Sequence, residues 1–260
     1  MLLDLTGKKV LVTGIANNRS IAWGIAQQLT AAGAEIGVTY LPDDKGRFEA
    51  KVKELTAPLK PTLFLPLNVQ NQEQIESVFN EIQTQWGQID GLVHCLAFAG
   101  KEELIGDFSA TSSEGFSRAL EISAHSLGAL CKHAKPLFSE GAGVVTLTYL
   151  GSDRAIPNYN VMGVAKAALE SSVRYLSAEL GPEKQVRVNA ISAGPIRTLA
   201  SSAIGGILEM IHNVEEKAPL RRTVTQNEVG NTAAFLISDL SSGISGQTIY
   251  VDAGYCINGM

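Results

Sequence analysis

The sequence predicts an α/β fold in which a single domain forms a doubly wound parallel sheet of about seven strands, with helices on both faces. Two observations predict this fold. Apolar runs of four to six residues alternate with helical patterns of about 12 residues or more, which is typical of βαβ units. The 260 residues are 45% hydrophobic and 18% charged, which is enough apolar surface for one sizeable core.

Each expected strand is a short apolar run that ends at glycine, proline or polar residues. The first run stops at Gly14, and the second is followed by a polar loop that contains Pro42. In a parallel sheet the carboxyl ends of the strands share one edge, so the loops that follow them should gather there. The expected strands lie at Lys8–Thr13, Glu35–Thr39, Thr62–Leu67, Gly91–His94, Val144–Thr148, Arg187–Ile191 and Thr248–Val251.

The expected helices show apolar residues at helical spacing. Gly33 and Gly87 end the first and third of them, because glycine is favoured just past a helix end. Pro157 marks the entry to the last helix, and Gly181-Pro182 should end it. The expected helices lie at Ser20–Ala32, Arg47–Leu55, Gln72–Trp86, Ser113–Ser139 (with room for a break) and from Pro157 to about Leu180.

Composition and charge exclude several classes of protein. A net charge of −5 gives no indication of nucleic-acid binding. Neither a signal peptide nor a long apolar run is evident, so no membrane span is expected. The three cysteines are sparse and lack metal-ligand spacing, which indicates free thiols in a reducing compartment such as the cytoplasm. The four histidines also lack ligand spacing, so no metal site is expected.

The first strand–helix turn has features of a dinucleotide site. Gly14 allows a sharp turn, and the helix that opens near Ser20-Ile21 offers N–H groups to a pyrophosphate. Gly24 would permit close packing of helix and sheet. The segment is not G-x-G-x-x-G, because Ser20 and Ile21 replace the glycine pair, so a generic strand–helix turn is an equal alternative at this point.

The second strand does not decide between NADH and NADPH. The acidic residue that usually binds the ribose diol is missing, and Tyr40-Leu41 occupies its place. Asp43-Asp44 follows, but so do Lys45 and Arg47, and cations in this region suit a 2′-phosphate.

Tyr159 and Lys166 are the most suggestive pair in the chain. They are seven residues apart, so on a helix they share one face about two turns apart. A cation near a phenol lowers the phenol's pKa, and such a pair suits a proton donor or oxyanion stabiliser. On spacing alone, an exposed lysine two turns from a half-buried tyrosine is the more common explanation, and many helices contain such a pair.

Taken over its whole length, the chain resembles the short-chain dehydrogenase/reductases, and within them the enoyl-[acyl-carrier-protein] reductases of type II fatty acid synthesis. The wide Tyr-x6-Lys spacing and Tyr149 near the preceding strand end carry the resemblance, because most short-chain reductases have Tyr-x3-Lys and a serine there. Other matching motifs are Ser20-Ile21-Ala22-x-Gly24, the segment from Ala155 to Lys166, the segment from Arg187 to Thr198, and Gly243-Ile244-Ser245-Gly246. The resemblance implies a Rossmann-type sheet.

The resemblance also implies a reaction: reduction of the trans-2 double bond of an enoyl thioester held on acyl carrier protein, with NADH, or alternatively NADPH, as the reductant. Hydride would pass to the β-carbon. The Tyr159 hydroxyl would stabilise the enolate oxygen, Lys166 would hold the nicotinamide ribose, and Tyr149 would line the pocket near the thioester.

The resemblance assigns the remaining contacts. The implied cofactor contacts are Gly14, Ser20, Ile21, Asn68, Val69, Ala97, Lys166, Ile196 and Thr198. The implied substrate contacts are Tyr149, Ala99, Met162, Ile204, Ile207 and Met210. Asn68 departs from the family's usual aspartate, and a simple turn residue is the alternative there. A homotetramer is implied as well, assembled through the helices at Ser113–Ser139 and Tyr159–Leu180.

The segment Thr198–Lys217 is interpreted as a mobile lid over the acyl chain, with an ordinary surface helix as the alternative. Basic residues that could meet an acidic carrier protein are few on this segment. Docking would then rely on Arg197 or on Arg221-Arg222, although the latter pair equally suits an ion-pairing face.

Two other functions stay open. A 3-oxoacyl-thioester reductase of the same superfamily would need a catalytic serine, for which Ser152 is a poor match. A nucleotide-sensing regulator would bind NAD(P) without turnover, but it would have no need of both Tyr159 and Lys166. Cys95 is expected to line the pocket rather than to act as a nucleophile, since the four histidines, the adjacent His94 included, are interpreted as structural and no other neighbouring base is evident.

Overall fold

The computed structural model describes residues 3–198, 201 and 205–258. Within these residues seven strands form one sheet in the order β3-β2-β1-β4-β5-β6-β7, and every neighbouring pair is parallel. The strand order reverses between β1 and β4, and sheets of this kind bind ligands at the carboxyl ends of the strands beside such a switch point. The strands are β1 (Lys9–Val12), β2 (Glu35–Tyr40), β3 (Leu63–Pro66), β4 (Ile89–His94), β5 (Phe138–Thr148), β6 (Arg187–Ala193) and β7 (Thr248–Val251).

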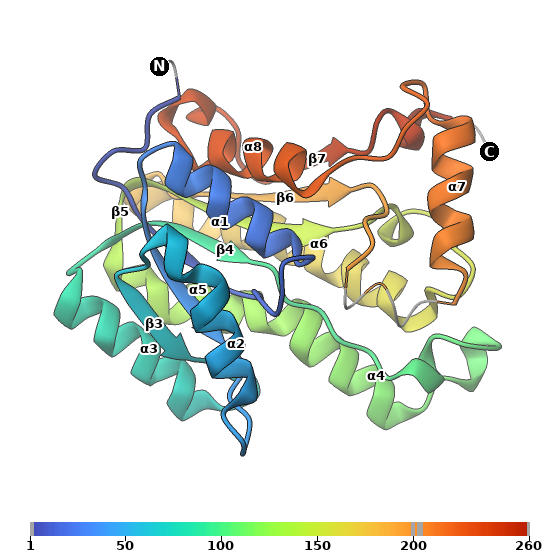
Figure 1. Ribbon diagram of the computed structural model, residues 1–260, viewed down its shortest axis with the longest axis horizontal. Helices are drawn as coiled ribbons and strands as arrows, with labels where there is room; N and C mark the ends of the chain where they lie inside the picture. Colours follow the sequence, from blue (N-terminus) through green and yellow to red (C-terminus); the bar gives the residue numbers. More distant parts are fainter. Residues whose placement is uncertain (1–2, 199–200, 202–204, 259–260) are drawn as a thin grey trace.

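Helices cover both faces of the sheet (Figure 1), which confirms the predicted fold class. One apolar core lies between the sheet and α3, α5 and α6, and the other lies between the sheet and α1, α2 and α8. Alternate residues of a strand pack into the two cores: Leu11 lies in the first, and Val10 and Val12 lie in the second. The helices are α1 (Ile21–Ala31), α2 (Arg47–Thr56), α3 (Gln72–Gln85), α4 (Ser113–Leu120), α5 (Ser126–Ala134), α6 (Asn160–Lys184), α7 (Ile207–Lys217) and α8 (Gln226–Ile237).

The helix expected over Ser113–Ser139 is wrong at its end. It is broken by a π-helical turn at Glu121–His125 and stops at Ala134. A 3-10 turn that contains Pro136 follows, and β5 then begins at Phe138 instead of Val144. Pro136 has no N–H to continue the helix, so the apolar residues after it join the strand.

The predicted stop at Gly181-Pro182 is also wrong, because α6 continues to Lys184. It ends where Gln185 adopts a left-handed backbone with φ +51° and donates its N–H to the Gly181 carbonyl. The Lys184 ammonium donates to the carbonyls of Pro136 and Phe138 and so fastens this last turn to the start of β5.

Helix α8 is absent from the elements expected from the sequence. It starts with a capping box in which the Thr225 hydroxyl accepts from the Glu228 N–H and the Glu228 carboxylate accepts from the Thr225 N–H. It crosses α1 so closely that a Cβ on Gly24 would lie 2.6 Å from the Cβ of Gln226. Gly24 therefore permits helix–helix packing, not the helix–sheet packing expected from the sequence.

The capping box makes a prediction about acid stability. Hydrogen bonds from Arg222 and Thr225 lower the pKa of Glu228 from 4.5 to about 2. A carboxylate with a depressed pKa stabilises the fold above pH 4.5, and this contribution is lost as the pH falls through 2. Glu228→Gln should therefore lower the free energy of unfolding by about 1 kcal/mol at pH 7, with a smaller difference at pH 2.

Urea unfolding of both proteins at pH 7 and at pH 2–3 measures this difference. Glu54→Gln is the control, because Glu54 is exposed on α2. An equal loss of stability at both pH values would contradict the proposed cause.

Candidate active site

The turn after β1 is built around Gly14. Its φ is +91°, a conformation that glycine adopts without strain. A Cβ at this position would lie 2.0 Å from the carbonyl oxygen of Cys95, at the end of β4. The backbones after β1 and β4 thus meet without an intervening side chain at the point where the strand order reverses.

Ser20 shapes the rest of this turn. Its hydroxyl accepts the N–H groups of Ala16 and Asn17 at 3.0 and 3.1 Å. The side chain does not cap α1, and the first turn of α1 has no acidic residue. The N–H groups at the start of α1, near Ile21, are therefore not capped by the Ser20 side chain. The positive end of a helix dipole favours an anion at this position. Together with the bare backbone at Gly14, this arrangement fits a dinucleotide pyrophosphate.

Asn68 forms a turn at the end of β3. Its side-chain oxygen accepts the Gln70 N–H at 3.0 Å, and its own N–H donates to the Gln74 side chain at 2.8 Å. Both contacts of Asn68 are those of a turn residue, which was the alternative considered for it. Val69 follows in the same turn and is half-buried. At the end of β2, the Tyr40 ring stacks on Phe64 with centroids 4.8 Å apart, while the Asp43 carboxylate accepts two N–H groups at the start of α2.

Two tyrosines form the centre of the site. Tyr149 follows β5 and Tyr159 immediately precedes α6, and their rings meet edge to face with centroids 5.0 Å apart at 67°. Tyr159 is 6% exposed, and Tyr149 is partly exposed. An apolar cluster surrounds both rings and includes Ala99 and Met162. The structure therefore places four of the predicted catalytic and substrate residues together.

Lys166 lies on α6, seven residues after Tyr159, and is 5% exposed. Its ammonium donates to the carbonyl of Leu147 in β5 at 2.7 Å. Burial lowers the pKa of Lys166 from 10.5 to about 8, so the side chain is still mainly charged at pH 7. A buried ammonium next to the strand end supplies positive potential to the site.

The pKa of Tyr159 differs from the sequence-based expectation. Burial raises this pKa well above the ordinary value of 10, and the nearby Tyr149 and Glu170 raise it further. The expected lowering of this pKa by Lys166 is wrong, because the phenol is buried and burial disfavours the charged phenolate. A phenol with a raised pKa stays protonated, and it can therefore donate a hydrogen bond to a developing oxyanion.

Two other groups near Lys166 stay uncharged. His94 is fully buried and hydrogen-bonds Thr146 and Ser126, each at 2.8 Å. Burial and then the Lys166 charge lower the pKa of His94 to about 3. Burial raises the pKa of the Cys95 thiol to about 11, so little thiolate is present at neutral pH.

The remaining predicted residues lie around the same edge of the sheet. Ala97 is exposed after β4, and Ile196 and Thr198 are partly buried after β6. Thr198 exchanges hydrogen bonds with Ser201, since each backbone N–H donates to the other residue's hydroxyl, at 2.8 and 3.0 Å. Ile204 lies outside the described residues.

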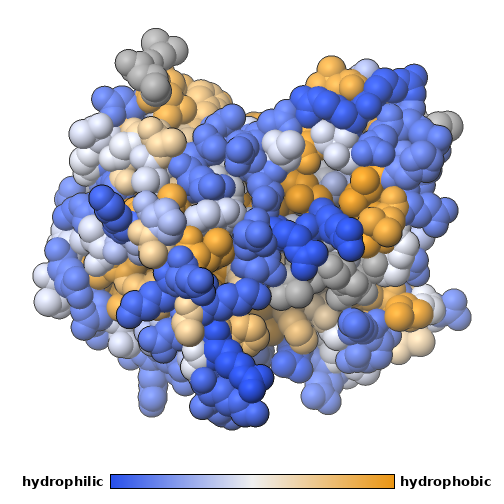
Figure 2. All heavy atoms as spheres, in the orientation of Figure 1, coloured by the Kyte–Doolittle hydropathy of each residue, from blue (hydrophilic) through white to orange (hydrophobic). Residues whose placement is uncertain are grey.

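Helix α7 carries Ile207 and Met210, both partly buried, and leaves Leu208 60% exposed. It stands beyond the carboxyl ends of β6 and β7 (Figure 1), and Figure 2 shows apolar side chains gathered beside it. Its N-terminus is linked to the site by Asn158, whose side-chain amide donates to the Gly205 carbonyl at 3.0 Å.

The sequence reasoning missed the residues that flank Tyr159. Asn158 and Asn160 both have positive φ, +59° and +33°, a conformation that asparagine tolerates better than most residues. Asn160 donates to the Gly106 carbonyl at 3.1 Å, while Asn158 holds Gly205. The Asn-Tyr-Asn triplet was a local signal for this unusual backbone.

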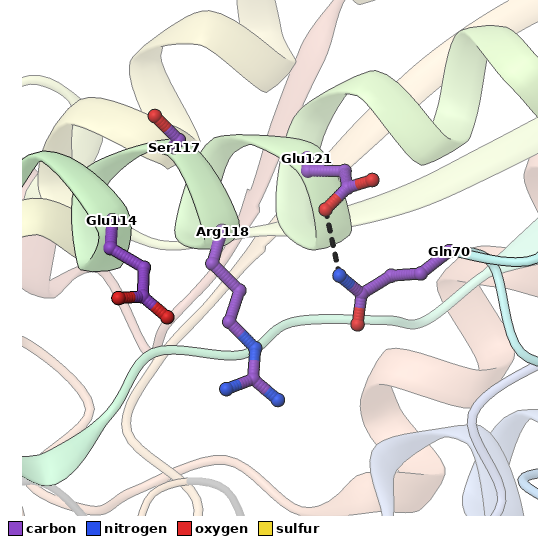
Figure 3. Close-up of a pocket in the computed structure, with 5 residues that line it drawn as sticks. All are labelled: Gln70, Glu114, Ser117, Arg118 and Glu121. Carbon is purple, nitrogen blue, oxygen red and sulfur yellow. Dashed lines mark hydrogen bonds between the residues drawn. The ribbon is translucent and has the colours of Figure 1, made fainter.

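A surface hollow of about 500 Å³ lies beside α4 (Figure 3). The Gln70 side chain donates to Glu121 across it at 2.7 Å, and the Arg118 guanidinium lies over the Phe98 ring, 4.6 Å from its centroid. Among the predicted site residues that the structure describes, none lines this hollow. The hollow is lined by Gln70, Glu114, Ser117, Arg118 and Glu121.

The basic residues considered for carrier docking differ in their contacts. Arg222 forms a two-point pair with Glu228 at 2.7 and 3.0 Å, which agrees with an ion-pairing face. Arg197 and Arg221 are exposed. Within the described ranges, no cluster of three or more histidine, cysteine or acidic side chains could hold a metal, and no helix is long and apolar enough to cross a membrane.

Comparison with known proteins agrees with this geometry. Residues 14–256 match the family model described as enoyl-(acyl carrier protein) reductase. The chain is 69% identical over 259 residues to the NADH enoyl-[acyl-carrier-protein] reductase FabI of Nostoc sp., covering 100% of both chains. It is 50% identical to FabI of Bacillus subtilis, covering 99% of both.

Solved structures give the same result. A crystal structure of the Bacillus cereus enoyl-acyl carrier protein reductase with NADP+ and indole naphthyridinone superimposes with a TM-score of 0.94, at 50% identity, over 98% of this chain and 99% of that one. The Aquifex aeolicus enzyme superimposes with a TM-score of 0.93 at 40% identity, over 98% and 99%. The chain therefore belongs to the enoyl-(acyl carrier protein) reductase family.

Proposed function

We propose that this chain reduces the trans-2 double bond of enoyl thioesters on acyl carrier protein in fatty acid synthesis, with NADH as the reductant. The observation that carries the proposal is the edge-to-face Tyr149–Tyr159 pair at the end of β5, together with the buried Lys166 ammonium, which donates to the Leu147 carbonyl two residues before Tyr149. Relatives that are 69% and 50% identical over essentially the full chain bear the name of NADH-dependent reductases with this activity.

The residues of the site would have separate roles in this reaction. Bound NADH would supply a hydride, and the β-carbon of the enoyl group would receive it. The Tyr159 hydroxyl would donate to the thioester oxygen, where negative charge develops as the enolate forms. Tyr149 would line the pocket beside the thioester, and Ala99 and Met162 would exclude water from it. Protonation at the α-carbon would complete the saturated thioester.

Cofactor binding would use the carboxyl ends of the central strands. Gly14, Ser20 and Ile21 would hold the pyrophosphate, and Lys166 the nicotinamide ribose. Ala97, Ile196 and Thr198 would flank the nicotinamide, and Asn68 and Val69 would meet the adenine. Asp43 already accepts two N–H groups of α2, so it is poorly free to bind a ribose diol.

The alternative of a 3-oxoacyl-thioester reductase is disfavoured by one contact. Ser152, its only candidate serine, donates its hydroxyl to Glu170 at 2.5 Å. A carbonyl reductase of this superfamily would need that hydroxyl to face the substrate.

The proposal includes a substrate lid and an assembly. The segment 198–217 would cover the acyl chain through Ile204, Ile207 and Met210. A homotetramer would form through α4, α5 and α6, and the 78% exposure of the Tyr175 side chain on α6 supports an interface there. A cytoplasmic location is supported by the three free cysteines, since free thiols suit a reducing compartment. Sedimentation velocity would measure the assembly, and a monomeric mass would contradict it.

Cofactor oxidation followed at the nicotinamide absorbance tests the proposed function. NADH and NADPH are each mixed with a crotonyl thioester and, separately, with an acetoacetyl thioester. We expect consumption of NADH with the crotonyl substrate and little with acetoacetyl. Consumption with acetoacetyl alone would assign the chain to the carbonyl reductases, and cofactor binding without turnover would make it a regulator.

A further inference from the structure

The turn that carries Tyr149 is fastened to α6 by one carboxylate. Oxygen Oε1 of Glu170 accepts hydrogen bonds from the Thr148 hydroxyl at 2.6 Å and from the Ser152 hydroxyl at 2.5 Å. Thr148 is the last residue of β5, and Ser152 closes the 3-10 turn that follows. Tyr149 therefore lies between two residues that are bonded to the same atom.

A second attachment lies one helical turn away. Lys166 and Glu170 are four residues apart on α6 and so share a face. Lys166 donates to the carbonyl of Leu147, immediately before Thr148. The segment 147–152 is thus bonded to α6 at both of its ends, and the Ser152 N–H donates to the Tyr149 carbonyl at 2.9 Å within it.

Close packing removes the remaining freedom. A Cβ on Gly163 would lie 2.7 Å from the Gly151 carbonyl oxygen, so the turn and the helix are in direct backbone contact. A Cβ on Gly151 would lie 2.4 Å from the Tyr159 ring. A shift of this turn would therefore change the 5.0 Å separation of the Tyr149 and Tyr159 rings.

From these contacts we infer that Glu170 is a positioning residue for the reductase reaction, and this role rests on the proposed function. Glu170 fixes where the Tyr149 hydroxyl lies relative to Tyr159 and Lys166, and it acts through the turn. Two hydroxyl donors require an acceptor with two lone pairs, and a carboxylate oxygen forms shorter and stronger bonds than a neutral one. Its negative charge one turn from Lys166 also favours the charged ammonium.

Kinetics of a double-mutant cycle test this role. The proteins are the wild type, Glu170→Ala, Tyr149→Phe and the double variant, assayed with NADH and a crotonyl thioester. We expect Glu170→Ala to lower kcat by about tenfold or more, because small misplacements in an active site are costly, with the KM for NADH changed by less than about threefold. In the Tyr149→Phe background, the same substitution should lower kcat by no more than about twofold.

Further variants keep the test decisive. Glu170→Gln retains an oxygen that can accept both hydroxyls, so it should recover most of the loss. If Glu170→Ala does not fold, Ser152→Ala or Thr148→Val takes its place in the cycle, because each removes one of the two hydrogen bonds to Glu170. Glu179→Ala is the matched control, because Glu179 lies on the same helix and forms a surface pair with Lys135.

Losses that add in the double variant would overturn the positioning role, since a general effect on the fold does not depend on the Tyr149 hydroxyl. A Glu170→Gln variant as impaired as Glu170→Ala would overturn it as well. A wild-type protein that does not reduce the crotonyl thioester would overturn the proposed function, and the positioning role with it.

Discussion

Replacement of Tyr159 by phenylalanine is expected to lower kcat about 10²–10³-fold, which is the usual cost of removing one oxyanion donor. The Kd for NADH should change little, because the lost hydroxyl acts on the substrate oxygen. The ring itself is retained, so its edge-to-face contact with Tyr149 and its close approach to Gly151 are preserved.

Lys166→Ala should affect both kcat and the Kd for NADH. The ammonium would hold the nicotinamide ribose, and its charge would support the oxyanion, so both NADH affinity and kcat should fall. Steady-state kinetics and NADH titration separate the two variants. Lys51→Ala is the control, since Lys51 is exposed on α2 and has no role in the proposed site or assembly. Unchanged turnover in both variants would remove this pair from the site.

Gly14→Ala should have the largest effect on folding. The added Cβ would lie 2.0 Å from the backbone oxygen of Cys95, and φ is +91°. Overpacking and backbone strain each cost about 1–3 kcal/mol, so a loss of about 2–6 kcal/mol is expected, which corresponds to a drop in Tm of about 5–20 °C. NADH affinity should fall as well, since the two strand ends at the cofactor site must separate.

Gly87→Ala provides the matched control. Gly87 has a similar φ of +74°, but a Cβ there would meet nothing within 4 Å. It isolates the backbone strain from the contact with Cys95. Equal drops in Tm for the two variants, measured by calorimetry, would show that the close approach to Cys95 has no consequence.

The sheet was predictable because its strands are short, apolar and separated by helical patterns, which leaves few arrangements other than a parallel sheet. Helix α8 was missed although Thr225 and Glu228 form a capping box that the sequence displays. Its small residues and its glycine serve the crossing with α1, a tertiary contact that no local pattern reveals. The end of α5 was missed for a similar reason, because β5 takes over apolar residues that also fit a helix.

The active site, too, was only partly predictable from the sequence. The spacing of Tyr159 and Lys166 predicts a shared helical face, and in the structure Tyr159 caps α6 while Lys166 lies within it, bonded to the Leu147 carbonyl. The direction of the pKa shift of Tyr159 could not be predicted, because it depends on burial by residues from other elements. The contacts of Glu170 join residues 18 and 22 positions away in the sequence, so only the folded structure reveals them.

Transfer of an isotope label tests the central claim most directly. The protein is given NADH deuterated at the transferring position of the nicotinamide together with a crotonyl thioester, and the product is analysed by NMR. We predict a saturated butyryl thioester with deuterium at C3, because the hydride goes to the β-carbon while Tyr159 stabilises the enolate oxygen. Deuterium at C2, or a product in which the double bond is intact, would contradict this account.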